Sequence, residues 1–167
     1  AVFFSHELLR PCGQCHCKTV QGPLRAAFRC TGEDTQIATL GKPFTTIEAV
    51  ENPNSPKIVV SNSGYAMYFS RSIIPFVRGV EKQEWINRYP FLKHLGIYAY
   101  RKEVLSQITK LPQSSLEIAE SLEQLRWLQN GYKIKVGTTS IEALGIDTHK
   151  DVERAEVFHA QHENENE

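Results

Sequence analysis

A strand that runs directly into a helix, over residues 94–105 (HLGIYAYRKEVL), is the feature that most restricts the fold of this chain. Ile97 and Ala99 alternate with Tyr98 and Tyr100, and this period of two is typical of a β-strand. The following RKEVL has the composition of a helix start. A strand followed at once by a helix is the repeating unit of α/β sheets, so the sequence predicts that fold class.

The same alternation of strands and helices continues on both sides of this unit. In the segment 57–71, two strands are joined by SNSG, a composition suited to a tight turn, and the second strand carries apolar residues on both faces. We expect that strand to be covered on both sides. Further strands are predicted over 36–40 and 132–140, and helical segments within 45–56, 77–91, 111–132 and 145–160.

The segment 111–132 has the clearest helical pattern. Ser114 and Glu117 form a capping box at its start, and Asn130-Gly131 supplies a stop. We therefore expect one long helix across this segment. Its predicted core stripe comprises Ile118, Leu122, Leu125 and Leu128.

Glu120, Glu123 and Trp127 would share the opposite ridge of that helix. This ridge is interpreted either as a solvent face with a Glu123–Arg126 pair or as part of a ligand site. In either case, a single long helix predicts that all three side chains lie away from the core.

Three further residues stand near the ends of predicted elements. His94 heads its strand, where it either caps backbone groups or faces a ligand. Arg71 closes an apolar strand and can bind a carboxylate, a phosphate or a neighbouring acid. Asp147 ends a strand before a capped helix, where it either assists the cap or holds Mg²⁺. Together they suggest a site for an acidic, hydroxylated ligand with a metal nearby.

The charge balance excludes some partners. Lysine plus arginine and aspartate plus glutamate number 19 each, so no electrostatic case exists for nucleic acid or an anionic membrane. No apolar run approaches the roughly 20 residues of a membrane span. The start, AVFFSHELLRPCGQ, is a poor secretion signal, and we expect a cytoplasmic protein without membrane insertion.

The four cysteines lie together in the first thirty residues, within a segment (1–33) whose composition differs from the rest. Their spacing is compatible with a zinc or redox site, but the pattern favours incidental thiols, because no second C-x2-C or H-x3-H follows. Both interpretations stay open. The residues are Cys12, Cys15, Cys17 and Cys30.

Five blocks carry a family resemblance: NPNSPKIVV, YFSRSIIPF, KHLGIYAYR, SSLEIAESLEQLRWLQNGYKIKV and GIDTHKDVERAE. In order and spacing they resemble the C-terminal part of the 3-deoxy-manno-octulosonate cytidylyltransferases, also called CMP-KDO synthetases. The match covers residues 34–158, and residues 159–167 read as a disordered acidic tail. The resemblance implies a nucleotidyltransferase-type, Rossmann-like mixed sheet flanked by helices, and a homodimer.

The family transfers a cytidylyl group from CTP to the sugar acid KDO, giving CMP-KDO and pyrophosphate for lipopolysaccharide synthesis. The resemblance implies that Asp147 is a catalytic residue and coordinates Mg²⁺. It also implies that five residues bind the sugar acid: Arg71, His94, Tyr98, Glu123 and Gln124.

Some family features have no match here. A glycine- and arginine-containing loop cradles the CTP phosphates in the family, and a QGDEP block supplies a second magnesium aspartate. Val20-Gln21-Gly22 is instead followed by Pro23-Leu24-Arg25, so we expect the nucleotide-binding part to be missing. The alternative to a transferase is a truncated, non-catalytic remnant that binds sugar acid or a partner subunit.

Overall fold

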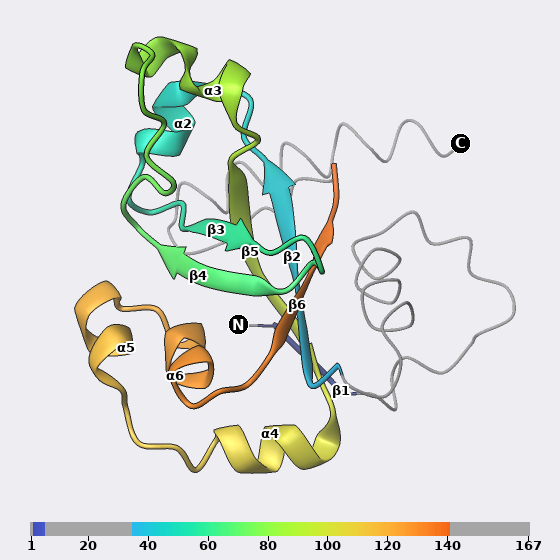
Figure 1. Cartoon of the computed structure of the whole chain (residues 1–167). Helices are drawn as coiled ribbons and strands as arrows, with labels where there is room; N and C mark the ends of the chain where they lie inside the picture. The colour runs from blue at the N-terminus through green and yellow to red at the C-terminus, as the bar shows by residue number, and fades with distance from the viewer. Residues whose placement is uncertain (1, 6–34, 141–167) are drawn as a thin grey trace, which may run out of the picture.

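The computed structural model describes residues 2–5, as backbone only, and residues 35–140. Its centre is a six-stranded sheet in the order β4-β3-β5-β2-β6, with β1 also paired to β5 (Figure 1). The strands are β1 (Val2–Ser5), β2 (Ile37–Pro43), β3 (Lys57–Val60), β4 (Ala66–Ser70), β5 (Leu92–Tyr100) and β6 (Ile134–Thr138).

The sheet is mixed and is organised around β5. One edge of β5 pairs antiparallel with β2, which pairs in parallel with β6. The other edge of β5 pairs antiparallel with β3 and in parallel with β1. This topology confirms the predicted α/β class with a mixed sheet.

The helices lie in two groups at opposite ends of the sheet (Figure 1). One group contains α2 (Ile47–Glu51), η3 (Lys82–Glu84) and α3 (Trp85–Arg88); the other contains α4 (Lys102–Ile108), α5 (Ser115–Glu120) and α6 (Gln124–Gln129). The helical segments predicted within 45–56 and 77–91 and the helix start after β5 are therefore confirmed. None of the described helices has the length and apolar character needed to cross a bilayer.

The prediction of one long helix over 111–132 is wrong. The predicted capping box is present at the start of α5, but Ser121 has a φ of 52° and ends that helix. Because the chain turns there, α6 does not continue the helical phase of α5. Ile118 is consequently 65% exposed, whereas Trp127, predicted to face away from the core, is 2% exposed.

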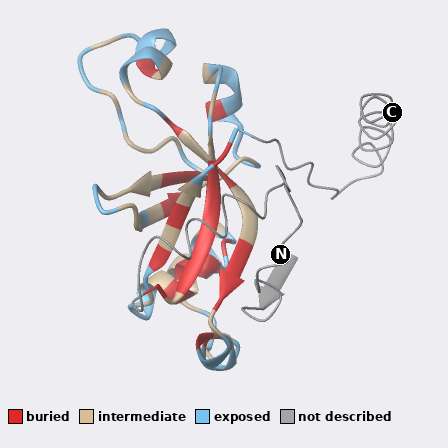
Figure 2. Ribbon diagram, turned by 90° about the vertical axis from the view of Figure 1, so that its right-hand side faces the viewer, coloured by how far each residue is buried: buried red, intermediate tan, exposed pale blue. Residues whose placement is uncertain are grey.

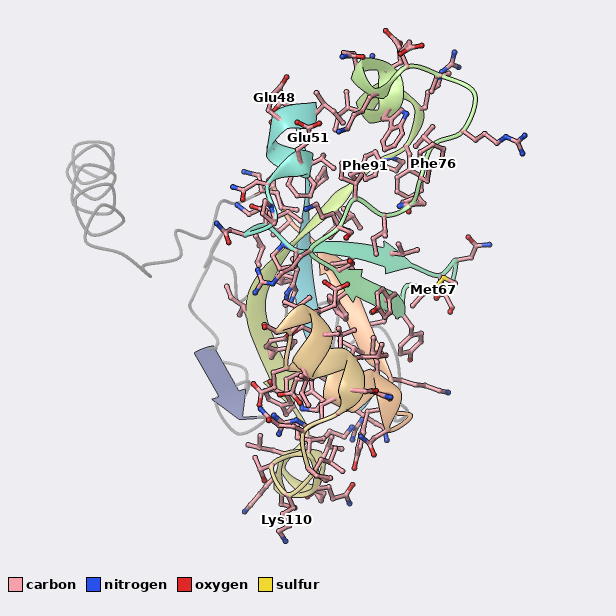
Figure 3. All side chains as sticks on the ribbon, turned by 90° about the vertical axis from the view of Figure 1, so that its left-hand side faces the viewer. Glu48, Glu51, Met67, Phe76, Phe91 and Lys110 are labelled. Carbon is pink, nitrogen blue, oxygen red and sulfur yellow. The ribbon has the colours of Figure 1, made fainter. Side chains whose placement is uncertain are left out.

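The expectation that the strand 66–70 is covered on both faces is also wrong. This strand, β4, lies at the edge of the sheet, and Met67 on it is 63% exposed and projects from the strand (Figure 3). The hairpin that joins β3 to β4 is as predicted. Gly64 in its turn has a φ of +77°, a conformation that favours glycine.

Two apolar clusters hold these layers together, and the buried residues follow the long strands (Figure 2). The main cluster packs the sheet against α4, α5 and α6. A smaller cluster lies between α2 and α3 and contains Val50, Trp85 and Phe91. The main cluster contains Ile37, Ile58, Phe69, Tyr98, Tyr100, Val104, Ile108, Leu122, Leu125, Trp127, Ile134 and Val136.

Candidate functional site

His94 lies on β5 inside the main cluster, and 7% of it is exposed. Its Nε2 atom is 3.0 Å from the Thr39 hydroxyl, and its Nδ1 atom is 3.4 Å from the Gln124 side-chain nitrogen. Both ring nitrogens therefore contact side chains from other elements. The interpretation that His94 caps backbone groups is not supported by these contacts.

Burial also determines the charge of this imidazole. The ring meets the Phe69 ring edge-on at a centroid distance of 4.9 Å and the Tyr98 ring at 5.2 Å. Removal from water disfavours the cation and lowers the pKa of His94 to about 3. The imidazole is thus neutral at physiological pH and can offer one donor and one acceptor.

Tyr98 presents a buried hydroxyl beside this histidine. Its ring stacks on Tyr100 and meets Trp127 edge-on at 5.0 Å. Within the described residues, its hydroxyl has no hydrogen-bond partner. Burial, and then the nearby Tyr100 and Glu123, raise the pKa of Tyr98 well above its usual value. An uncharged, unpaired phenol is a costly group to bury unless a ligand hydrogen-bonds to it.

Helix α6 brings two of the predicted residues to the same place. Gln124 is its first residue and is buried against His94. Glu123 occupies the preceding cap position, with a half-exposed side chain whose carboxylate lies 3.7 Å from Arg126. The predicted Glu123–Arg126 pair therefore exists, and Glu123 stands at the solvent boundary of the cluster.

Arg71 follows β4 and holds the turn between α5 and α6. Its Nε donates to the Glu120 carbonyl at 2.7 Å and its Nη2 to the Ser121 carbonyl at 3.2 Å. Its Nη1 donates to the Pro53 carbonyl at 3.0 Å. These bonds use three of the five guanidinium N–H groups, so the cation still has donors for an anionic ligand.

Glu120 completes this junction from α5. Its carboxylate accepts hydrogen bonds from the Ser70 hydroxyl at 2.6 Å and from the Arg71 backbone N–H at 2.9 Å. The Glu120 carboxylate therefore binds the main chain of Arg71, while the Arg71 guanidinium binds backbone carbonyls. Glu120 therefore anchors α5 to the end of β4 and does not lie on a solvent face.

Lys57 is a buried lysine that the sequence analysis did not single out. It is fully buried at the start of β3, and its ammonium donates to the carbonyls of Asn52 at 2.9 Å and Arg71 at 2.8 Å. Burial and the nearby Arg71 lower the pKa of Lys57. The available signal was a lysine at the first position of an apolar strand.

A pocket of about 470 Å³ opens beside Arg71. Its lining includes Ser72 as well as Arg71, and also Phe76, which packs edge-on against Trp85 at 4.9 Å. An ion pair between Lys82 and Glu51 also lines it. Figure 3 shows Glu51 and Phe76 at this end of the molecule.

The five predicted sugar-acid residues are related through these contacts and through the chain between α5 and α6. Arg71 binds the α5–α6 turn, and Glu123 and Gln124 follow that turn. Gln124 contacts His94, which contacts Tyr98. Gln124, His94 and Tyr98 are thus in side-chain contact, whereas Arg71 reaches the turn before them through the Ser121 carbonyl and Glu123 adjoins them by its place before Gln124.

Other predicted features lie outside the described residues. These are Asp147, the helix predicted over 145–160, the acidic tail 159–167 and the four cysteines of segment 1–33. Among residues 35–140, no group of three or more His, Cys, Asp or Glu side chains could hold a metal ion.

Comparison with known proteins gives consistent matches. A family model described as cytidylyltransferase matches residues 21–134. A 3-deoxy-manno-octulosonate cytidylyltransferase of Phocaeicola vulgatus is 61% identical over 134 residues, which cover 78% of this chain and 53% of that protein. The enzyme of the same name from Bacteroides thetaiotaomicron is 61% identical over 127 residues, covering 74% of this chain and 51% of that protein.

A solved structure agrees with these sequence matches. It is a CMP:2-keto-3-deoxy-manno-octonic acid synthetase complexed with CTP, with a TM-score of 0.73 and 35% identity over 85% of this chain and 57% of that one. This chain spans about half the length of the curated relatives that it matches. The family model, the relatives and the fold together show that the chain belongs to the cytidylyltransferase family.

Proposed function

We propose that this chain provides the sugar-acid-binding part of a CMP-KDO synthetase, which transfers a cytidylyl group from CTP to KDO and releases pyrophosphate. One observation carries the proposal: Gln124, His94 and Tyr98 are in side-chain contact, and Arg71 binds the turn that leads into Glu123 and Gln124. These five residue types are suited to one acidic, hydroxylated ligand. The relatives named for this activity support it and favour an enzyme over a non-catalytic remnant.

Each side chain has a role that follows from its chemistry. The two remaining guanidinium donors of Arg71 would bind the carboxylate of the sugar acid. The Tyr98 phenol, the Gln124 amide and the Glu123 carboxylate would bind hydroxyl groups. Neutral His94 would accept a hydrogen bond without adding charge, since its pKa of about 3 keeps it unprotonated.

In the proposed reaction, the anomeric oxygen of KDO forms a bond to the α-phosphorus of CTP, and the bond from that phosphorus to pyrophosphate breaks. The contribution of the described residues is to hold the sugar acid in line for this attack. Charge neutralisation by Mg²⁺ is also part of the proposal, with Asp147 as its expected ligand. We likewise propose a homodimer and a cytoplasmic location.

Tyr98→Phe is the sharpest test of the sugar-acid site, because it removes only the unpaired hydroxyl and keeps the ring contacts. We expect calorimetric titration with KDO to show an affinity about fivefold lower in this variant, since one hydrogen bond is worth about 1 kcal/mol. Thermal stability should be unchanged or slightly raised, because a buried unpaired group is removed. Equal KDO affinity in both proteins would contradict the role of Tyr98.

Activity is tested separately by pyrophosphate release from CTP in the presence of KDO and Mg²⁺, with Asp147→Ala as the control. Release that disappears in the control supports the complete transferase reaction. KDO binding without release would support the alternative of a non-catalytic sugar-acid-binding chain. The absence of both binding and release would contradict the proposed function.

A further inference from the structure

The hydrogen bonds around His94 form a chain whose direction can be assigned. The Thr39 hydroxyl lies 2.7 Å from the Ile97 carbonyl and 3.0 Å from His94 Nε2. A carbonyl can only accept, so the single hydroxyl proton of Thr39 is donated to Ile97. The same oxygen must then accept from His94, which places the imidazole proton on Nε2.

The opposite ring nitrogen is consequently unprotonated. The pKa of His94 is lowered by burial to about 3, so the doubly protonated ring is not populated near neutral pH. Nδ1 therefore carries a lone pair, which accepts from the Gln124 amide at 3.4 Å. That distance exceeds the usual 2.7–3.2 Å range, so the lone pair is only weakly engaged.

The strand geometry explains why Thr39 can bind both groups. Thr39 lies opposite Tyr98 in the β2–β5 ladder, and the register shifts between Thr39 and Gly41, which lies opposite His94. Such an irregularity redirects the side chains beside it.

We propose that Thr39 is a positioning residue that fixes the tautomer of His94, with the proton on Nε2 and an acceptor lone pair on Nδ1. The second part of this inference rests on the proposed function: the Nδ1 lone pair selects a hydroxyl donor of the sugar acid. A ligand group that can only accept hydrogen bonds is disfavoured at this position. No described charged side chain makes a hydrogen bond to either ring nitrogen, so the tautomer is set by neutral groups.

The test is two-bond ¹H–¹⁵N NMR of the chain labelled at histidine, which reports the protonation of each ring nitrogen. His94→Gln assigns the signals. We expect wild type and Thr39→Ser to show the proton on Nε2, because serine retains the hydroxyl. Thr39→Val has nearly the same shape but cannot accept from Nε2–H, so we expect a substantial population with the proton on Nδ1.

Gln124→Leu is the matched control on the other ring nitrogen. Because Thr39 sets the tautomer, we expect this variant to keep the proton on Nε2. A wild-type spectrum with the proton on Nδ1 would overturn the proposal without any variant, and so would an unchanged tautomer in folded Thr39→Val. If Thr39→Val does not fold, the wild-type, Thr39→Ser and Gln124→Leu spectra still decide the assignment.

KDO titration then separates this inference from the proposed function. We expect Thr39→Val to bind KDO at least about fivefold more weakly, the change that loss of one hydrogen bond of about 1 kcal/mol or more would give, and Thr39→Ser to restore the affinity. If the tautomers are as expected but wild type does not bind KDO, the proposed function fails while the positioning role stands. If KDO binds equally to all variants, the selectivity part of the inference is overturned.

Discussion

The two apolar clusters of this fold differ in the polar groups that they enclose. The main cluster surrounds His94 and Gln124, which are buried and hydrogen-bonded to partners on other elements. The smaller cluster of Val50, Trp85 and Phe91 is apolar and aromatic, and the Trp85 indole N–H donates to the Val80 carbonyl at 3.3 Å.

This difference indicates that the two clusters do not specify the arrangement of their strands and helices equally strictly. Buried polar groups are costly when unpaired, so those of the main cluster specify one arrangement of β2, β5 and α6. The smaller cluster needs only apolar packing and borders an open pocket, and Phe76 beside it is 74% exposed. We therefore expect changes in the main cluster to act on the whole fold and those in the smaller cluster to act locally.

Leu125→Ala should have the largest effect. Leu125 is fully buried on α6, and removing such a side chain leaves a cavity, so we expect the free energy of unfolding to fall by about 3 kcal/mol. Urea denaturation measures this change. Ile118→Ala on α5 is the control, because Ile118 is largely exposed and should change stability by less than about 0.5 kcal/mol. Equal losses in the two variants would contradict the division of 111–132 into two helices.

The second prediction concerns pH and His94. Its folded-state pKa of about 3 lies below the ordinary 6.5, so between these values the unfolded state binds a proton that the folded state does not. Stability contributed by the neutral ring is therefore complete above pH 6.5 and is lost as pH falls toward 3. We expect a contribution to the slope of up to about 1.4 kcal/mol per pH unit.

Comparison with His94→Gln isolates this contribution, because the other titrating groups are the same in both proteins. Urea denaturation at several pH values between 4 and 7 should give a shallower stability slope in the variant. Parallel slopes would show that His94 titrates normally and is not buried as a neutral ring. Val50, Trp85 and Phe91 do not titrate, so these side chains of the smaller cluster add nothing to the slope of stability against pH.

Val50→Ala tests the smaller cluster. Val50 is fully buried on α2, and the loss of two methyl-sized groups should cost about 1.5 kcal/mol. We expect the loss to appear as faster amide hydrogen exchange in α2 and α3, with exchange in β5 unchanged, since local opening exposes few contacts of the main cluster. Faster exchange throughout the sheet would show that the two clusters unfold as one unit.

Local patterns predicted much of the fold because the interactions that they describe are local. The alternation in β5 and the Ser114–Glu117 capping box both depend on residues close in sequence, and both are present. At the break, the carbonyls of Glu120 and Ser121 accept hydrogen bonds from Arg71, fifty residues away. No pattern within 111–132 contains that contact, so periodicity alone favoured a continuous helix.

In the candidate site too, local sequence patterns indicated some residues, whereas contacts between distant parts of the chain were not predictable. His94 and Arg71 were noticed as polar residues near the ends of elements, and their role in sugar-acid binding was implied by the family resemblance. Thr39 and Lys57 were missed because each lies in an apolar strand, where the pattern predicts burial and says nothing of partners. Their partners, His94 for Thr39 and the Asn52 and Arg71 carbonyls for Lys57, become evident only when the strands are assembled.

Glu123→Gln should have the smallest effect on stability and therefore separates structure from binding most cleanly. Its half-exposed carboxylate lies 3.7 Å from Arg126, and an exposed pair of this kind contributes about 0.2–0.5 kcal/mol. The partner of Arg126 that matters for the fold is Glu117, which its guanidinium binds through Nε at 2.7 Å and through Nη2. Urea denaturation should thus give nearly the wild-type midpoint.

If Glu123 binds a hydroxyl of the sugar acid, the same variant should show weaker KDO binding, since an amide is a poorer acceptor than a carboxylate. Glu117→Gln is the matched control: it should lower stability more than Glu123→Gln does, because its carboxylate is buried and also completes the capping box of α5. Unchanged KDO affinity in Glu123→Gln would remove Glu123 from the site. Recognition of the ligand would then belong to the buried residues of the main cluster and not to Glu123 at its solvent boundary.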